Sequence, residues 1–154
     1  MELKSHSEDF RRLFDSILPT LGWGAGETRR PCLIAIDGDM GTGKTHLANW
    51  LAWQFGAVAV HLDYYWLEQL GDMEKLKKED LLNIIRKRIS DNRIIIVEGI
   101  YSFKLLQKLD YKINFKVVIS HKSGRETDIF QKYLNSNQDL FSHIECKLSA
   151  YEHN

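Results

Sequence analysis

The stretch GDMGTGKT, from Gly38 to Thr45, combines glycine, lysine and hydroxyl side chains at a spacing suited to holding phosphate. It matches G-x-x-x-x-G-K-[ST], the P-loop pattern. Glycines let consecutive backbone N–H groups converge on phosphate oxygens. Lys44 is expected to reach the β- and γ-phosphates, and the Thr45 hydroxyl to ligate Mg²⁺. The residues expected to bind the nucleotide are Gly38, Asp39, Met40, Gly41, Thr42, Gly43, Lys44, Thr45 and His46.

Two other nucleotide-binding patterns do not fit this stretch. The dinucleotide fingerprint G-x-G-x-x-G would need a glycine where His46 stands. The guanine-reading segment N-K-x-D, expected of a GTPase, occurs nowhere in the chain. A P-loop for a nucleoside triphosphate is therefore the interpretation that we adopt.

Acidic residues follow two further apolar segments. Asp63 opens DYYW after AVAVHL, and Glu98 ends IIIVE. A carboxylate beside a P-loop can orient an acceptor hydroxyl and take its proton, which is the role expected of Asp63. An acid after four apolar residues is typical of a Walker B strand, so Glu98 is expected to hold Mg²⁺ directly or through water. The alternatives are a turn or N-cap aspartate at 63 and an ordinary strand-end glutamate at 98.

Three other features leave alternatives open. Asp39 lies inside the loop, where it would repel phosphate unless it points outward or touches substrate or metal. Tyr64, Tyr65 and Trp66 either stack on a flat substrate or pack in the core. Arg125 is the leading candidate for a lid arginine that stabilises transferring phosphate, ahead of Lys122 and His121, although KSGRET also fits a solvated helix start.

The elements that must position these residues alternate between strand and helix. Apolar runs predict buried parallel strands, and apolar residues at helical spacing predict helices. Strands are predicted at 32–36, 57–62, 93–99 and 115–120, and helices at 6–18, 43–55, around 81–89, at 102–109 and over most of the chain from 124 onward. This order predicts an α/β protein: a three-layer P-loop NTPase fold with a small, mostly parallel sheet of about four strands, in one domain over 1–154. Ligands gather at the carboxyl ends of such strands, where GDMGTGKT, DYYW and EGIY all lie.

The composition of the chain argues against some classes of binding partner. The 154 residues carry 21 Lys and Arg against 21 Asp and Glu, so no net basic field attracts nucleic acid. The basic segment KLKKEDLLNIIRKR is explained as the wet face of an amphipathic helix. Cys32 and Cys146 lack metal-type spacing, no apolar run approaches membrane-spanning length, and MELKSHSEDF lacks the apolar core of a signal peptide. We expect a cytoplasmic protein with neither nucleic-acid nor membrane partners; its oligomeric state is not indicated.

The segments IDGDMGTGKT, DYYW and VEGIY together resemble the uridine kinase and phosphoribulokinase group of P-loop kinases, over roughly residues 8–130. The resemblance implies ATP and Mg²⁺ as cosubstrates, with transfer of the γ-phosphoryl group to a small-molecule hydroxyl. It also implies that Asp63 is the acceptor-side base, that Glu98 supports Mg²⁺ and that Arg125 belongs to a lid.

The chain departs from this group at three points. Only 27 residues, Leu67 to Arg93, separate DYYW from the third strand, where uridine kinases carry a larger substrate-binding insertion. No fifth strand is evident before the end of the chain, and the lid lacks paired arginines. Two functions therefore remain open. One is a small-molecule kinase acting on a nucleoside or sugar-like hydroxyl, and the other is a nucleotide-binding module with weak or no kinase activity that acts through a protein partner.

Overall fold

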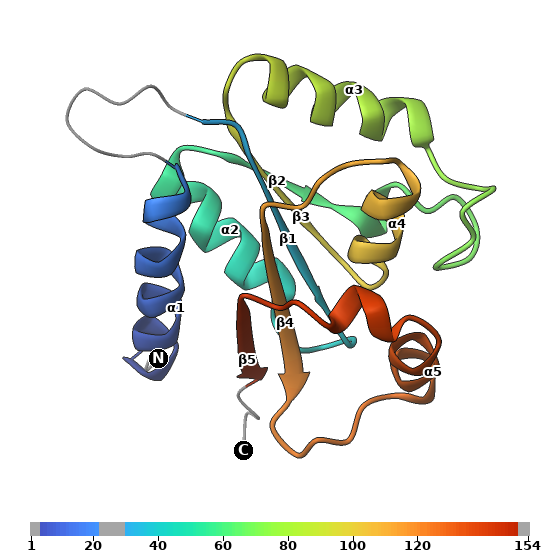
Figure 1. Cartoon of the computed structure of the whole chain (residues 1–154). Coiled ribbons are helices and arrows are strands. Elements are labelled where there is room, and N and C mark those ends of the chain that lie inside the picture. Colours follow the sequence, from blue (N-terminus) through green and yellow to red (C-terminus); the bar gives the residue numbers. More distant parts are fainter. Residues whose placement is uncertain (1–3, 22–29, 151–154) are drawn as a thin grey trace.

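The computed structural model of the chain describes residues 4–21 and 30–150. Five strands form one parallel sheet in the order β2-β3-β1-β4-β5. The strands are β1 (Cys32–Gly38), β2 (Val58–His61), β3 (Ile94–Glu98), β4 (Phe115–His121) and β5 (Cys146–Ala150). Helices lie on both sides of the sheet, so the chain forms three layers (Figure 1).

Alternate residues of the central strands face opposite helical layers. In β1, Ile34 and Ile36 pack in the core under α1 (Lys4–Ile17) and α2 (Lys44–Phe55). Leu33 and Ala35 pack in the second core, under the other three α-helices. Those helices are α3 (Lys78–Ser90), α4 (Ser102–Lys108) and α5 (Asp128–Ser136). Short 3₁₀ turns complete the chain at η1 (Leu18–Leu21), η2 (Leu62–Tyr64) and η3 (Gln138–Phe141). Because β1 and β3 are buried on both faces, they appear in the sequence as unbroken apolar runs.

The predicted fold class is confirmed, with one strand more than the four expected. The tail is not mostly helical: α5 ends at Ser136, and residues 146–150 add β5 in parallel beside β4. This strand lies at the sheet edge and alternates between half-buried and exposed residues, ending in buried Ala150. Five residues with such a short alternation, CKLSA, lack the long apolar run that marks the central strands.

Strand register places the candidate residues at one edge of the sheet. Ile36 of β1 lies beside Glu98 of β3, and Glu98 lies beside His61 of β2. The parallel strands therefore end together, just before the loop that follows Gly38 and the turn that contains Asp63. Within the described part of the chain, none of the helices has the length and apolar character needed to cross a bilayer.

Candidate active site

The loop after β1 has the backbone of a phosphate cradle. Gly38 ends the strand, and Gly43 precedes α2 in a left-handed conformation with φ of 88°. At Gly38, where φ is 151°, a Cβ atom would lie 2.3 Å from the carbonyl oxygen of Ile119 on β4. Only glycine allows the strand to turn this close to its neighbour. The loop then delivers Lys44 and Thr45 at the start of α2, where the helix dipole favours an anion.

Lys44 is held inside this loop. Its Nζ donates to the backbone carbonyl of Asp39 at 2.6 Å, and the Thr42 hydroxyl donates to the same oxygen at 2.9 Å. Burial lowers the pKa of Lys44, and nearby carboxylates, Glu98 first among them, offset only part of that effect. The ammonium group thus lies in a largely desolvated site, where its interaction with phosphate charge is stronger than in water.

Glu98 and Thr45 meet directly. The Thr45 hydroxyl donates to Oε1 of Glu98 at 2.9 Å, and Glu98 is only 3% exposed. Nδ1 of His61 lies 2.7 Å from the same oxygen. Sequence reasoning missed His61; its signal is its place at the end of β2, in register with Glu98 once the strands are paired.

A cavity of about 190 Å³ is lined by four of the nine residues expected to bind the nucleotide, together with Asp63 and Glu98. Asp63 lies in η2 at its rim, exposed, and its charge acts on Lys44. The N-cap position of η2 is occupied by His61, and Asp63 lies within the first turn, so Asp63 is not the N-cap of this turn. The cavity is lined by Met40, Gly41, Lys44, Thr45, Asp63, Leu70, Glu98 and Ile100.

Asp39 lies in the loop but is fully buried and outside the lining of this cavity. Its carboxylate accepts hydrogen bonds from the backbone N–H and the hydroxyl of Thr127, the latter at 2.7 Å, and from Met40 N at 2.7 Å. Nε2 of His121 lies 3.6 Å from it. Burial alone would raise the pKa of Asp39, but these hydrogen bonds outweigh it and lower the pKa. The structure therefore places the Asp39 carboxylate toward the β4–α5 connection, and Thr127 is its main partner.

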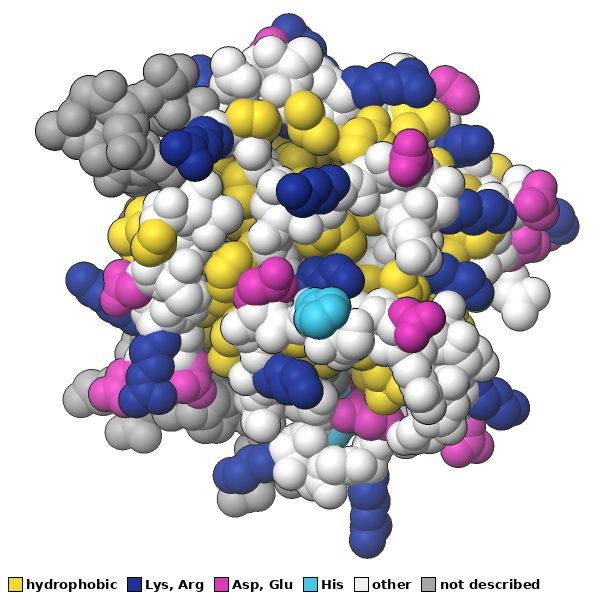
Figure 2. All heavy atoms as spheres, viewed as in Figure 1, with side chains coloured by type: hydrophobic (Ala, Val, Ile, Leu, Met, Phe, Trp, Pro, Cys, Tyr) yellow, Lys and Arg dark blue, Asp and Glu magenta, His cyan; other side chains and the backbone are white. Residues whose placement is uncertain are grey.

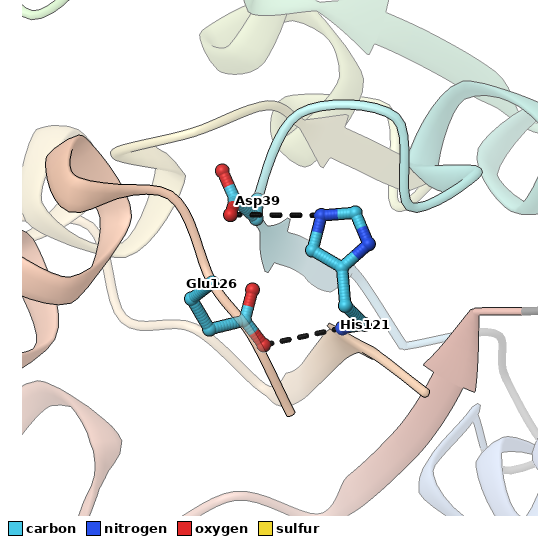
Figure 3. Close-up of side chains that lie close together, drawn as sticks. All are labelled: Asp39, His121 and Glu126. Carbon is cyan, nitrogen blue, oxygen red and sulfur yellow. Dashed lines mark hydrogen bonds and ion pairs between the residues drawn. The ribbon is translucent and has the colours of Figure 1, made fainter. Parts of the chain in front are cut away.

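Asp39, His121 and Glu126 form a cluster whose ligand atoms all lie within 4.8 Å of one another (Figure 3). Oxygen and imidazole donors of this kind can hold a metal ion. The hydrogen bonds of Asp39 already engage both of its oxygens, however, and Oε1 of Glu126 accepts from the backbone N–H of His121 at 3.1 Å. These hydrogen bonds join the P-loop to the segment after β4, while Oε2 of Glu126 is buried without a hydrogen-bond partner among the described residues.

Asp37, the last acid of β1 before Gly38, is also fully buried. It accepts hydrogen bonds from Gly38 N at 2.9 Å, from Phe103 N at 3.1 Å and from the Tyr133 hydroxyl at 2.8 Å. Burial raises the pKa of Asp37 to about 6 despite these donors and the charge of Lys44. Asp37 thus joins the root of the P-loop to α4 and α5, and its partner Tyr133 was not predicted from the sequence.

Arg125 lies in the connection between β4 and α5, exposed and outside the cavity lining. Lys122 is exposed as well, and His121 faces Asp39. Among the other expected residues, His46 lies in the first turn of α2, with its ring 5.7 Å from that of Phe10. The site residues thus divide into a cavity group and a group in the β4–α5 connection.

The aromatic triplet divides between the two interpretations. Tyr65 and Trp66 are half-buried and pack against the core beneath α3 and α4. Tyr64 is 75% exposed and, with His61 and Lys77, lines a second cavity of about 320 Å³ beside β2. Tyr65 lines the same cavity from its half-buried position, so Tyr64 is the most exposed of the three rings but not the only one that borders this cavity.

Solved structures similar to this chain include three that are described as kinases or a possible kinase. A protein described as a possible uridine kinase from Bacillus stearothermophilus superimposes with a TM-score of 0.56 and 18% identity, over 96% of this chain and 100% of that one. A gluconokinase from Sinorhizobium meliloti aligns with a TM-score of 0.47 and 15% identity, over 81% of this chain and 86% of that one. A shikimate kinase from Bacteroides thetaiotaomicron aligns with a TM-score of 0.42 and 16% identity, over 77% and 86%. No protein-family model and no curated protein sequence matches the chain. The first likeness, at 18% identity, shows that this chain shares the fold of that protein.

Proposed function

We propose that this chain is an ATP-dependent kinase that transfers the γ-phosphoryl group to a hydroxyl of a small molecule. The observation that carries the proposal is the cavity in which Lys44, Thr45, Asp63 and Glu98 converge. A P-loop lysine, a hydroxyl and carboxylates that line one small cavity are the parts that phosphoryl transfer needs.

The residues fit ATP and Mg²⁺ on chemical grounds. The backbone N–H groups of the loop and Lys44 suit the β- and γ-phosphates, and Mg²⁺ prefers the oxygen donors that Thr45 and Glu98 supply. When bound, Mg²⁺ neutralises charge on the transferring phosphoryl group. Asp63 orients the acceptor hydroxyl and takes its proton as the acceptor oxygen bonds to the γ-phosphorus. The bond to the bridging oxygen breaks, and ADP leaves.

The test is to incubate the chain with ATP, Mg²⁺ and a panel of nucleosides and sugars, and to read products by mass spectrometry. We expect one acceptor to gain a phosphate with stoichiometric formation of ADP.

Lys44→Ala should abolish this transfer. Asp63→Asn should lower kcat by about 10²- to 10⁴-fold, the usual contribution of a general base, while ATP binding stays within a few-fold of wild type. Asp15→Asn, an exposed aspartate on α1, is the matched control. Full turnover in Asp63→Asn would contradict its assignment as base.

One observation favours the second candidate, a nucleotide-binding module that acts through a partner protein. Among the residues that the structure describes, Lys44 is the sole cation that lines the cavity, and Arg125 stays outside it. Arginines that close over phosphates are worth large rate factors in phosphoryl transfer. If no acceptor in the panel is phosphorylated while the chain still binds ATP, the module is the better description.

The same proposal includes a small-molecule substrate rather than nucleic acid. Lys and Arg side chains alternate with Asp and Glu over the face shown in Figure 2, and the formal net charge of the whole chain is zero. A nucleic-acid interface would gather basic residues on one surface.

A further inference from the structure

We propose that His61 is a positioning residue that orients the Glu98 carboxylate toward the cavity, a role that rests on the kinase function proposed above. His61 ends β2 and lies beside Glu98 in the parallel register. Its Nδ1 is 2.7 Å from Oε1 of Glu98, and the two side chains are 20% and 4% exposed. The pair therefore lies inside the molecule, at the point where the sheet meets the cavity.

Two donors from different elements bind the same oxygen of Glu98. His61 approaches from β2, and the Thr45 hydroxyl approaches from α2 at 2.9 Å. Within the described part of the chain, the hydrogen bonds to this carboxylate all go to Oε1, while Glu98 lines the cavity. The arrangement holds one oxygen in place and leaves Oε2 available to the cavity, where a metal ion or its bound water would use it. Such outer partners of a ligating carboxylate are known to tune affinity and activity.

The ring of His61 is itself held in orientation. Tyr64 packs edge-on against it, with ring centroids 5.8 Å apart and an interplanar angle of 84°. A carboxylate only accepts hydrogen bonds, so Nδ1 must carry a proton to bond to Glu98. The hydrogen bond thereby selects the protonation site on the ring, and this can be measured without any catalytic assay.

The first test is long-range ¹H–¹⁵N NMR of the ligand-free chain. We expect the Nδ1 resonance of His61 to show a bonded proton in the wild type and to change in Glu98→Ala. His143, an exposed histidine outside the site, should be the same in both proteins. An unprotonated Nδ1 in the wild type, or an unchanged resonance in Glu98→Ala, would overturn the proposal.

The second test compares His61→Ala with His61→Asn, whose side-chain amide nitrogen lies close to the position of Nδ1. Loss of an outer partner of a metal ligand typically costs about 10- to 100-fold. We therefore expect His61→Ala to lower kcat and to weaken Mn²⁺ binding to the nucleotide complex, measured by electron paramagnetic resonance, by that factor. His61→Asn should recover most of both, and His143→Ala should match the wild type. A His61→Ala protein with wild-type kcat and Mn²⁺ affinity would refute the positioning role, as would His61→Asn being as impaired as His61→Ala.

The two proposals fail separately. If no acceptor is phosphorylated by any of these proteins, the kinase function fails. The NMR resonance of His61 and the Mn²⁺ affinities then still decide whether His61 holds Glu98.

Discussion

Two buried aspartates flank Gly38 and hold the P-loop from different sides. Asp37 accepts three hydrogen bonds, two of them from α4 and α5, and Asp39 is bound by Thr127 at the start of α5. A buried carboxylate is costly unless donors surround it, so each position depends on partners contributed by distant parts of the chain. These acids support the cradle rather than line the cavity.

Asp37 should leave a signature in the pH dependence of stability. Its pKa is raised from 3.8 to about 6 in the folded chain, so the folded state binds the proton more tightly than the unfolded state. The stability from this proton is fully present below about pH 4 and is lost as pH rises through about 6. Urea unfolding should therefore show that the free energy of unfolding of the wild type, minus that of Asp37→Asn, falls by roughly 2–3 kcal/mol between pH 4 and 7, at 1.36 kcal/mol per pKa unit. A difference that is flat or rises with pH would contradict this.

Gly38→Ala should damage both stability and nucleotide binding. The new Cβ would meet the carbonyl oxygen of Ile119 at 2.3 Å, and this backbone atom cannot rotate away. We expect a loss of roughly 2–4 kcal/mol in the free energy of unfolding from overpacking and backbone strain. Gly124→Ala is the control, because φ there is 68° but nothing lies within 4 Å. Urea unfolding of both variants measures the loss. Gly124→Ala should lower the free energy of unfolding by about 1–2 kcal/mol, from the left-handed backbone alone. If Gly38→Ala and Gly124→Ala lower the free energy of unfolding equally, the contact with Ile119 does not add to the cost at Gly38.

At the scale of elements, the connection between β4 and α5 is held by hydrogen bonds at both of its ends. His121 N bonds to Glu126, and Thr127 bonds to Asp39 while also accepting from Phe130 N as the N-cap of α5. The connection that carries Arg125 is thus short and anchored to the P-loop. Any movement of Arg125 toward bound phosphate takes place within these anchors.

Thr127→Val tests this anchor with a side chain of nearly equal shape. It removes the hydroxyl bond to Asp39 and the cap of α5, and we expect a loss of roughly 2–3 kcal/mol in unfolding free energy. Amide hydrogen exchange should also quicken at residue 127. Thr127→Ser keeps the hydroxyl and should retain most of the stability. If Val and Ser behave alike, the hydroxyl does not anchor the connection.

The alternation of β5 gives another test at this scale. Leu148 is half-buried against the core under α1 and α2, whereas Ser149 is exposed. Leu148→Ala should cost about 1–2 kcal/mol, less than a full core truncation, and Ser149→Ala should stay within about 0.5 kcal/mol. Chemical denaturation of both variants measures the difference. Similar costs at 148 and 149 would argue against a strand with one buried face.

For the whole molecule, the sheet order unites the ends of β1, β2 and β3 into one site, and two helical layers bury the strands. Because the cavity draws residues from the P-loop, η2 and β3, a ligand bound there contacts segments distant in sequence. Binding to the folded state alone then stabilises the entire fold.

Thermal unfolding measures this linkage. ATP with Mg²⁺ at 100 times its dissociation constant should stabilise the chain by about 2.7 kcal/mol. For a chain of this size that corresponds to a rise in Tm of roughly 5–10 °C. Lys44→Ala should lose most of the rise at the same ATP concentration. A full rise in Lys44→Ala would place the nucleotide elsewhere.

The parts of this molecule that sequence could predict are those encoded in consecutive residues. The glycine and lysine spacing of the P-loop, the apolar runs of β1 and β3 and the acids that follow the strands are all local patterns. They are sufficient for the fold class and for naming Lys44, Asp63 and Glu98 as candidates. β5 was not predicted, because an edge strand of five residues with one half-buried face carries little local sequence signal.

Only the tertiary structure decided which side chains meet. His61 and Glu98 are 37 positions apart, Asp39 and Thr127 are 88 apart, and Asp37 and Tyr133 are 96 apart. Each pairing depends on strand register or on how α5 packs against the sheet, and composition or periodicity near one residue cannot specify its partner. The direction of the Asp39 carboxylate, away from the cavity and toward Thr127, follows from the same packing. Local chemistry therefore determined the P-loop pattern, and long-range packing determined which residues hold that loop in place.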